Sequence, residues 1–97
     1  MKLIDPKYGM IVGPDGEPMI VKAATLEPIP DDEPLCLFRA RDHNALPGAL
    51  QPYALKCEED RCTDFHMDGI QNRVEAFHNF RKEHPERMKQ PGITRGL

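Results

Sequence analysis

The chain has 97 residues, with 13 Lys or Arg against 16 Asp or Glu, and a formal net charge of −3. A chain of this size builds one modest core, and with no Trp, four Phe and two Tyr it has little material to enclose a substrate-sized catalytic cavity. The acidic balance argues against general nucleic-acid affinity, and no run is apolar for long enough to span a membrane. An enzyme is therefore the least supported class.

The N-terminal segment predicts a β-hairpin. Two short apolar runs, residues 10–12 and 19–21, flank the turn sequence GPDGEP. Pro14 restricts φ and Gly16 tolerates the positive φ of a tight turn. Pro18 then begins the second strand, where a missing N–H donor is tolerated at a sheet edge.

A proline-rich, acidic connector precedes a third predicted strand. Residues 28–34 contain three prolines and three acidic side chains, which favours an extended, solvated backbone. Residues 35–40, LCLFRA, are mainly apolar at both alternating sets of positions. We therefore expect a central strand that is covered on both faces, with Cys36 buried in it.

Two arginines leave this predicted strand on the same face, because alternate strand residues point the same way. These are Arg39 and Arg41. Within the fold they would pair with the acidic connector, which contains Asp31 and Asp32. The alternative is that they bind an acidic or phosphate group of a partner.

The segment 46–59 predicts an irregular helix, because apolar residues recur at spacings of three and four while Pro47 and Pro52 interrupt it. Asp42 or Asn44 is the expected cap. The apolar stripe consists of Leu46, Leu50, Tyr53, Ala54 and Cys57.

The last helix has the clearest pattern. Asp68 with Gln71 resembles a capping box, and Pro85 predicts the end of the helix. We expect a small α+β domain over residues 1–84, in which two helices pack on one face of an antiparallel sheet made of the hairpin and the third strand. Residues 85–97 are the predicted extended tail.

Two blocks carry a resemblance, PIPDDEPLCLFRARD at residues 28–42 and HPERMKQPGIT at residues 84–94. Both resemble short proteins of phages and prophage-bearing bacteria. Neither block is a catalytic signature, so the resemblance implies only a cytosolic accessory protein that a phage expresses inside its host. Such a protein would act by binding a host protein.

One group of residues has ligands for a metal. Zinc takes four nitrogen or sulfur ligands in a tetrahedron. Cys57, Cys62, His66 and His78 supply two thiols and two imidazoles, although the Cys-x4-Cys gap is loose and the two histidines are far apart. The alternative is that Cys57 is an ordinary residue of the apolar stripe.

The charge is unevenly distributed. Residues 1–70 hold seven basic and thirteen acidic side chains, and residues 71–97 hold six and three. The basic region includes Arg73, Arg81 and Lys82, which would contact a protein partner or, alternatively, nucleic acid.

We therefore expect a non-enzymatic protein-interaction module. The alternatives are a small zinc-stabilised module and a nucleic-acid-binding accessory protein. Three cysteines without an apolar signal-peptide core in the first nine residues predict reduced thiols and a cytoplasmic protein. Short strands leave open sheet edges, so a second copy could add to one and form a homodimer.

Overall fold

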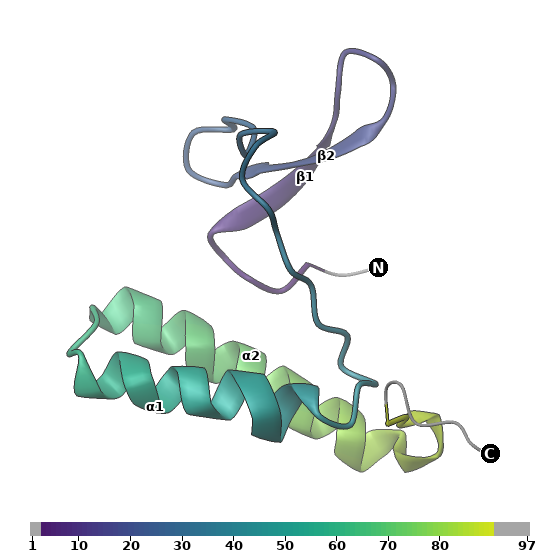
Figure 1. The fold of residues 1–97 in the computed structure, drawn as a ribbon, viewed down its shortest axis with the longest axis vertical. Coiled ribbons are helices and arrows are strands. Elements are labelled where there is room, and N and C mark those ends of the chain that lie inside the picture. Colours follow the sequence, from purple (N-terminus) through teal and green to yellow (C-terminus); the bar gives the residue numbers. More distant parts are fainter. Residues whose placement is uncertain (1–2, 91–97) are drawn as a thin grey trace. The chain divides into compact units, whose positions relative to one another are not determined.

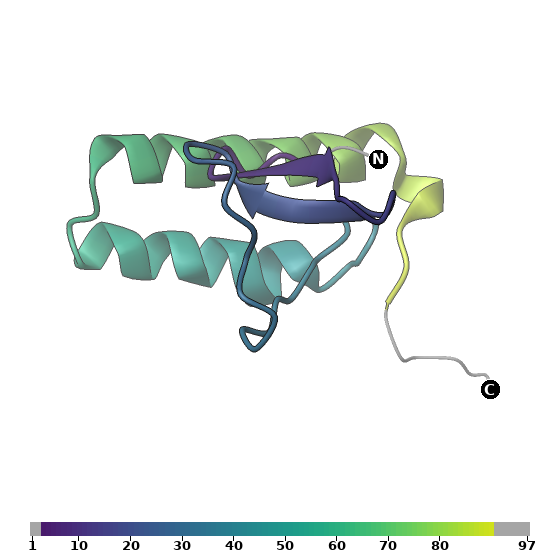
Figure 2. The ribbon, with the colours of Figure 1, turned by 90° about the horizontal axis from the view of Figure 1, so that it is seen from above.

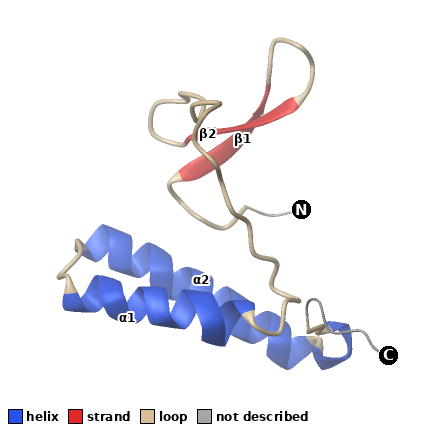
Figure 3. Cartoon of the chain, viewed as in Figure 1, coloured by secondary structure: helices blue, strands red, loops and turns tan. Residues whose placement is uncertain are grey.

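A computed structural model describes residues 3–90 of the chain. It divides the chain into two compact units, Met1–Cys36 and Leu37–Leu97. Among the described residues, no helix is both long and apolar enough to cross a membrane. The predicted α+β class is confirmed, because one unit holds an antiparallel sheet and the other holds the helices (Figures 1 and 3). The elements are β1 (Tyr8–Val12), β2 (Pro18–Lys22), the π-helical turn η1 (Leu46–Leu50), α1 (Gln51–Glu59), α2 (Asp64–Glu83) and the 3₁₀ turn η2 (Pro85–Arg87).

The predicted hairpin is confirmed. β1 and β2 pair antiparallel, with Tyr8 opposite Lys22 and Val12 opposite Pro18. The turn closes with a backbone hydrogen bond of 3.0 Å from the Gly16 N–H to the Gly13 carbonyl, and Gly16 has a φ of 82°. Glycine suits this position because it has no Cβ that would clash at positive φ.

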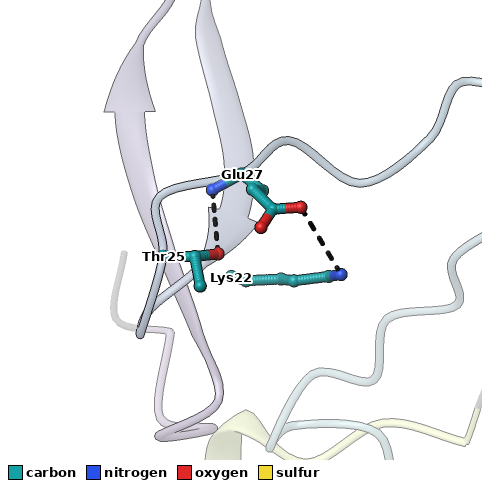
Figure 4. A network of polar contacts seen from close by, with 3 residues as sticks. All are labelled: Lys22, Thr25 and Glu27. Carbon is teal, nitrogen blue, oxygen red and sulfur yellow. Dashed lines mark hydrogen bonds and ion pairs between the residues drawn. The ribbon is translucent and has the colours of Figure 1, made fainter.

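After β2 the chain turns sharply back on the hairpin (Figure 4). The hydroxyl of Thr25 accepts a hydrogen bond of 3.3 Å from the Glu27 N–H, and the Glu27 carboxylate lies 4.0 Å from the Lys22 ammonium. The backbone then forms a single antiparallel bridge between Val21 and Pro28. Val21 is fully buried and is the centre of this small unit.

The predicted third strand is wrong. Residues 35–40 form no strand, and the sheet in the described part of the chain consists of β1 and β2 alone. Cys36 is exposed rather than buried, and Leu37 and Phe38 are exposed as well. A strand needs a neighbour to satisfy its backbone groups, and an apolar run does not show whether such a neighbour exists. The single domain over residues 1–84 and the packing of helices on the sheet stay predictions.

The helical unit is an antiparallel pair. In Figures 1 and 2, α1 and α2 lie side by side and are joined by a short turn. Their shared core is thin, because its buried residues are Ala54, Cys57 and Ile70. The partly buried residues that complete it are Cys62, Met67 and Val74.

The predicted irregular helix is confirmed, since η1 runs into α1 and α1 ends at Glu59. The expected N-cap of the last helix is wrong, because α2 begins after Thr63 rather than at Asp68. A capping-box pattern within a helix looks the same in sequence as one at its start. Neither Asp42 nor Asn44 caps η1, whose N-terminus has no side-chain cap. Asp42 instead accepts a hydrogen bond of 2.9 Å from the Asn44 N–H.

The described part of the predicted tail is not simply extended. It begins with the turn η2, after α2 has ended before Pro85 as expected. Lys89 then pairs with an earlier segment: its N–H donates to the Arg41 carbonyl at 2.9 Å, and its carbonyl accepts from the His43 N–H at 2.7 Å. Residues 91–97 of the predicted tail lie outside the described residues.

Candidate metal centre

Three of the four predicted metal ligands lie together at the turn between the helices. The donor atoms of Cys57, Cys62 and His66 all lie within 4.8 Å of one another. The Cys57 Sγ and His66 Nε2 atoms are 3.6 Å apart. Cys57 is buried, and the other two residues are half-buried. The cluster is therefore part of the thin core and also reaches the surface.

The end of α1 brings the two cysteines together. Asp60 is the C-cap, and Arg61 follows in the left-handed region with a φ of 56°. The Cys62 N–H donates to the Cys57 carbonyl at 3.0 Å, and the Arg61 N–H donates to the Glu58 carbonyl at 3.1 Å. This pair of bonds is the Schellman motif, in which the side chains at the positions of Cys57 and Cys62 meet.

The start of α2 adds the histidine. Thr63 is extended and caps the helix, with its hydroxyl accepting a hydrogen bond of 3.3 Å from the His66 N–H. His66 is thereby held in the first turn of α2, three residues after the Thr63 cap. Two adjacent cap motifs thus place all three donor side chains.

The separations fit a tetrahedral zinc ion. Zinc binds sulfur at about 2.3 Å and nitrogen at about 2.0 Å, so tetrahedral angles put a sulfur and a nitrogen ligand about 3.6 Å apart. The distance between Cys57 Sγ and His66 Nε2 is 3.6 Å. Two sulfur ligands would be about 3.8 Å apart. The Cys57 and Cys62 sulfur atoms lie within 4.8 Å of each other. Thiolate and imidazole donors are also those that suit zinc.

A tyrosine of the predicted apolar stripe belongs to this cluster. Tyr53 is 48% exposed, and its hydroxyl lies 3.4 Å from the His66 Nε2 atom. Its ring meets the imidazole edge-on, with centroids 6.2 Å apart. Partial burial and the hydrogen bond with Cys57 raise the pKa of Tyr53, while the Arg73 cation opposes that rise. The signal in the sequence is its position four residues before Cys57, which puts both on one face of α1.

His78 does not join the cluster. It is exposed on α2, twelve residues after His66. Twelve residues of helix span roughly 18 Å, which is too far for two ligands of one ion. The wide spacing in the sequence already pointed to this outcome.

The predicted partner-binding residues of the connector are at the surface. Asp31 and Asp32 are exposed in a turn, Arg39 is exposed and Arg41 is half-buried. Because residues 35–40 form no strand, the alternation that put the two arginines on one face does not apply. Their role in binding a partner stays a prediction.

The basic residues of α2 differ in their surroundings. Arg73 is half-buried and lies close enough to act on Tyr53. The Arg81 guanidinium donates to the His43 carbonyl, and its buried Nε has no hydrogen-bond partner in the described part of the chain. Lys82 is exposed. Arg81 therefore contributes to the fold of the helical unit.

Comparison of the chain with protein-family models, curated proteins and solved structures found no match. A functional assignment therefore depends on the geometry of the chain's own residues.

Proposed function

We propose that this protein is a small non-enzymatic module whose helical unit is held together by one zinc ion at Cys57, Cys62 and His66. The observation that carries the proposal is the distance of 3.6 Å between Cys57 Sγ and His66 Nε2, in a group whose donor atoms lie within 4.8 Å. Separate helices and the turn between them supply these ligands, so one ion would join α1 to α2.

The composition of the core supports a metal staple. Its buried residues are Ala54, Cys57 and Ile70, which together remove little apolar surface from water. Small units with such cores are commonly stabilised by disulfides or a structural metal. The free energy of metal binding adds to the free energy of folding, because the unfolded chain does not hold the ligands together.

Thermal unfolding with and without zinc tests this proposal. We expect zinc to raise the Tm of the wild-type chain, and a chelator to reverse the rise. Cys57→Ser and Cys62→Ser should each abolish the zinc-dependent rise. Cys36→Ser is the matched control, because Cys36 is exposed and lies in the other unit. A Tm that zinc leaves unchanged would rule out the staple.

We also propose that the module acts by binding a protein through the edge of its hairpin. Met10, Ile11 and Val12 are consecutive residues of β1, and 41%, 37% and 73% of their respective surfaces are exposed. An exposed apolar strand in a two-stranded sheet is suited to pair with an added strand. That strand would come from a protein partner or from a second copy, which gives a homodimer.

A charged edge tests this second proposal. Val12→Lys should abolish dimerisation in sedimentation and the capture of any partner from a lysate. Leu55→Lys, at an exposed position of α1, is the control and should keep both. If the two variants dimerise and capture partners equally well, the edge of β1 is not the binding surface.

Nucleic-acid binding is less well supported. Two cations of the basic region already contact other residues of the chain. Arg81 donates to the His43 carbonyl, and Arg87 lies 4.8 Å from the Phe80 ring centroid.

A cytoplasmic location is a further proposal, supported by three free cysteines. The phage or prophage relationship stays a prediction.

A further inference from the structure

We propose that the hydroxyl oxygen of Tyr53 is the fourth ligand of the metal. This inference rests on the proposed zinc site and deepens it. Three ligands from the chain leave one vertex of the tetrahedron, which a water molecule fills in catalytic sites and a fourth protein group fills in structural ones. The identity of the fourth donor therefore decides which kind of site this is.

The position of Tyr53 fits that vertex. Oxygen and nitrogen ligands of tetrahedral zinc, each at about 2.0 Å from the metal, are about 3.3 Å apart. The Tyr53 hydroxyl lies 3.4 Å from His66 Nε2, and Cys57 Sγ lies 3.6 Å from the same nitrogen. Both separations match those of ligands that share one ion.

The secondary structure keeps Tyr53 at this place. It precedes Cys57 by four residues on α1, so the two side chains are neighbours on one helix face. The aromatic ring also contacts the imidazole of His66 edge-on, at an interplanar angle of 71°. A ring held from two sides needs little rearrangement to bind an ion.

The charge of the four-ligand site is small. Two thiolates, one phenolate and a neutral imidazole around a divalent ion carry a net charge of about −1. Arg73 lies seven residues after His66 on α2, and its cation would offset part of this negative charge. On binding, the two S–H bonds and the O–H bond break, and the three protons pass to the buffer without any change of oxidation state.

Four protein ligands would close the site to substrate. Water or a substrate could then bind only by displacing Tyr53 or by expanding the coordination. The ion is therefore structural, in agreement with a non-enzymatic module.

A zinc titration followed in the near ultraviolet tests this ligand. The chain has no Trp and only two Tyr, so the absorption band of a tyrosinate is not masked. Wild type and Tyr8→Phe should both gain this band up to one equivalent of zinc at neutral pH. Tyr53→Phe keeps the ring but should show no band, release about one proton fewer, and bind zinc roughly tenfold or more weakly.

A parallel titration with cobalt(II) separates the two proposals, because thiolate–cobalt bands report the cysteines independently. Thiolate bands without a zinc-induced tyrosinate, and equal zinc affinity in Tyr53→Phe, would overturn Tyr53 as a ligand and leave the metal site in place. The absence of thiolate bands in the wild-type chain would overturn the site itself.

Discussion

The Nε2 atom of His66 lies 3.6 Å from the Sγ atom of Cys57, although the two residues belong to different helices. Two backbone motifs produce this contact, a Schellman motif at the end of α1 and the Thr63 cap at the start of α2. Cys57 is also one of the buried residues in the core of the helical unit. Variants of the two motifs therefore test the local structure, and metal binding tests its chemistry.

Replacing Arg61 by glycine should stabilise the metal-free chain. Arg61 has a φ of 56°, a conformation that costs a residue with a Cβ about 1 kcal/mol relative to glycine. Urea unfolding in the presence of a chelator should give Arg61→Gly a higher free energy of unfolding by about that amount. A lower value would contradict the assigned Schellman motif. Leu55→Gly, on the exposed face of α1, is the control and should destabilise the chain.

Loss of the Thr63 cap should weaken both the fold and the metal site. Thr63→Ala removes the hydroxyl that accepts from the His66 N–H, at a cost of about 1 kcal/mol in the free energy of unfolding. Because the cap also holds His66 in place, the zinc affinity should fall. Thr63→Ser restores the acceptor and should recover both. An Ala variant with unchanged zinc affinity would show that the cap does not position the ligand.

The Arg81 guanidinium should stabilise the helical unit. It donates to the His43 carbonyl, so Arg81→Ala should lower the free energy of unfolding by about 1 kcal/mol. The neighbouring Lys82 is exposed, and Lys82→Ala should change little. Chemical denaturation of the two variants measures the difference, and equal stabilities would remove the structural role of Arg81.

Alkaline pH should destabilise the metal-free chain through Tyr53. Partial burial and the hydrogen bond with Cys57 raise its pKa above 10.0. The folded state thus retains the phenol proton to higher pH than the unfolded chain. The resulting stability is fully present below pH 10.0 and is lost as the pH rises through the folded pKa.

Urea unfolding at increasing pH checks the sign of this effect. Tyr8→Phe keeps Tyr53 and should lose stability above pH 10.0 more steeply than Tyr53→Phe does. Identical pH profiles of the two variants would show that Tyr53 does not contribute to the loss of stability at alkaline pH.

Local turn and cap chemistry explains which elements could be predicted from the sequence. Pro14 and Gly16 are local signals that predict the hairpin turn. Pro47 and Pro52 likewise predict the irregular helix that η1 and α1 form. The strand at residues 35–40 failed because strand pairing depends on distant residues, which an apolar run does not reveal.

The candidate site was predictable only in part. A Cys-x4-Cys gap is long for a pair of zinc ligands. The left-handed conformation of Arg61 brings the two cysteines together, and the sequence does not reveal this conformation because Arg61 is not a glycine. Tyr53 was missed because a residue four positions before Cys57 also fits an apolar stripe. Its exposure of 48%, and its hydroxyl facing His66, became visible only in three dimensions.

Native mass spectrometry of the purified chain, with and without a chelator, tests the zinc site most directly. We expect a mass excess of one zinc ion per chain, which the chelator removes. His66→Gln should lose that excess and His78→Gln should keep it, because only His66 belongs to the cluster. A wild-type chain that carries no metal after incubation with zinc would contradict the site and leave the three residues as a packed core.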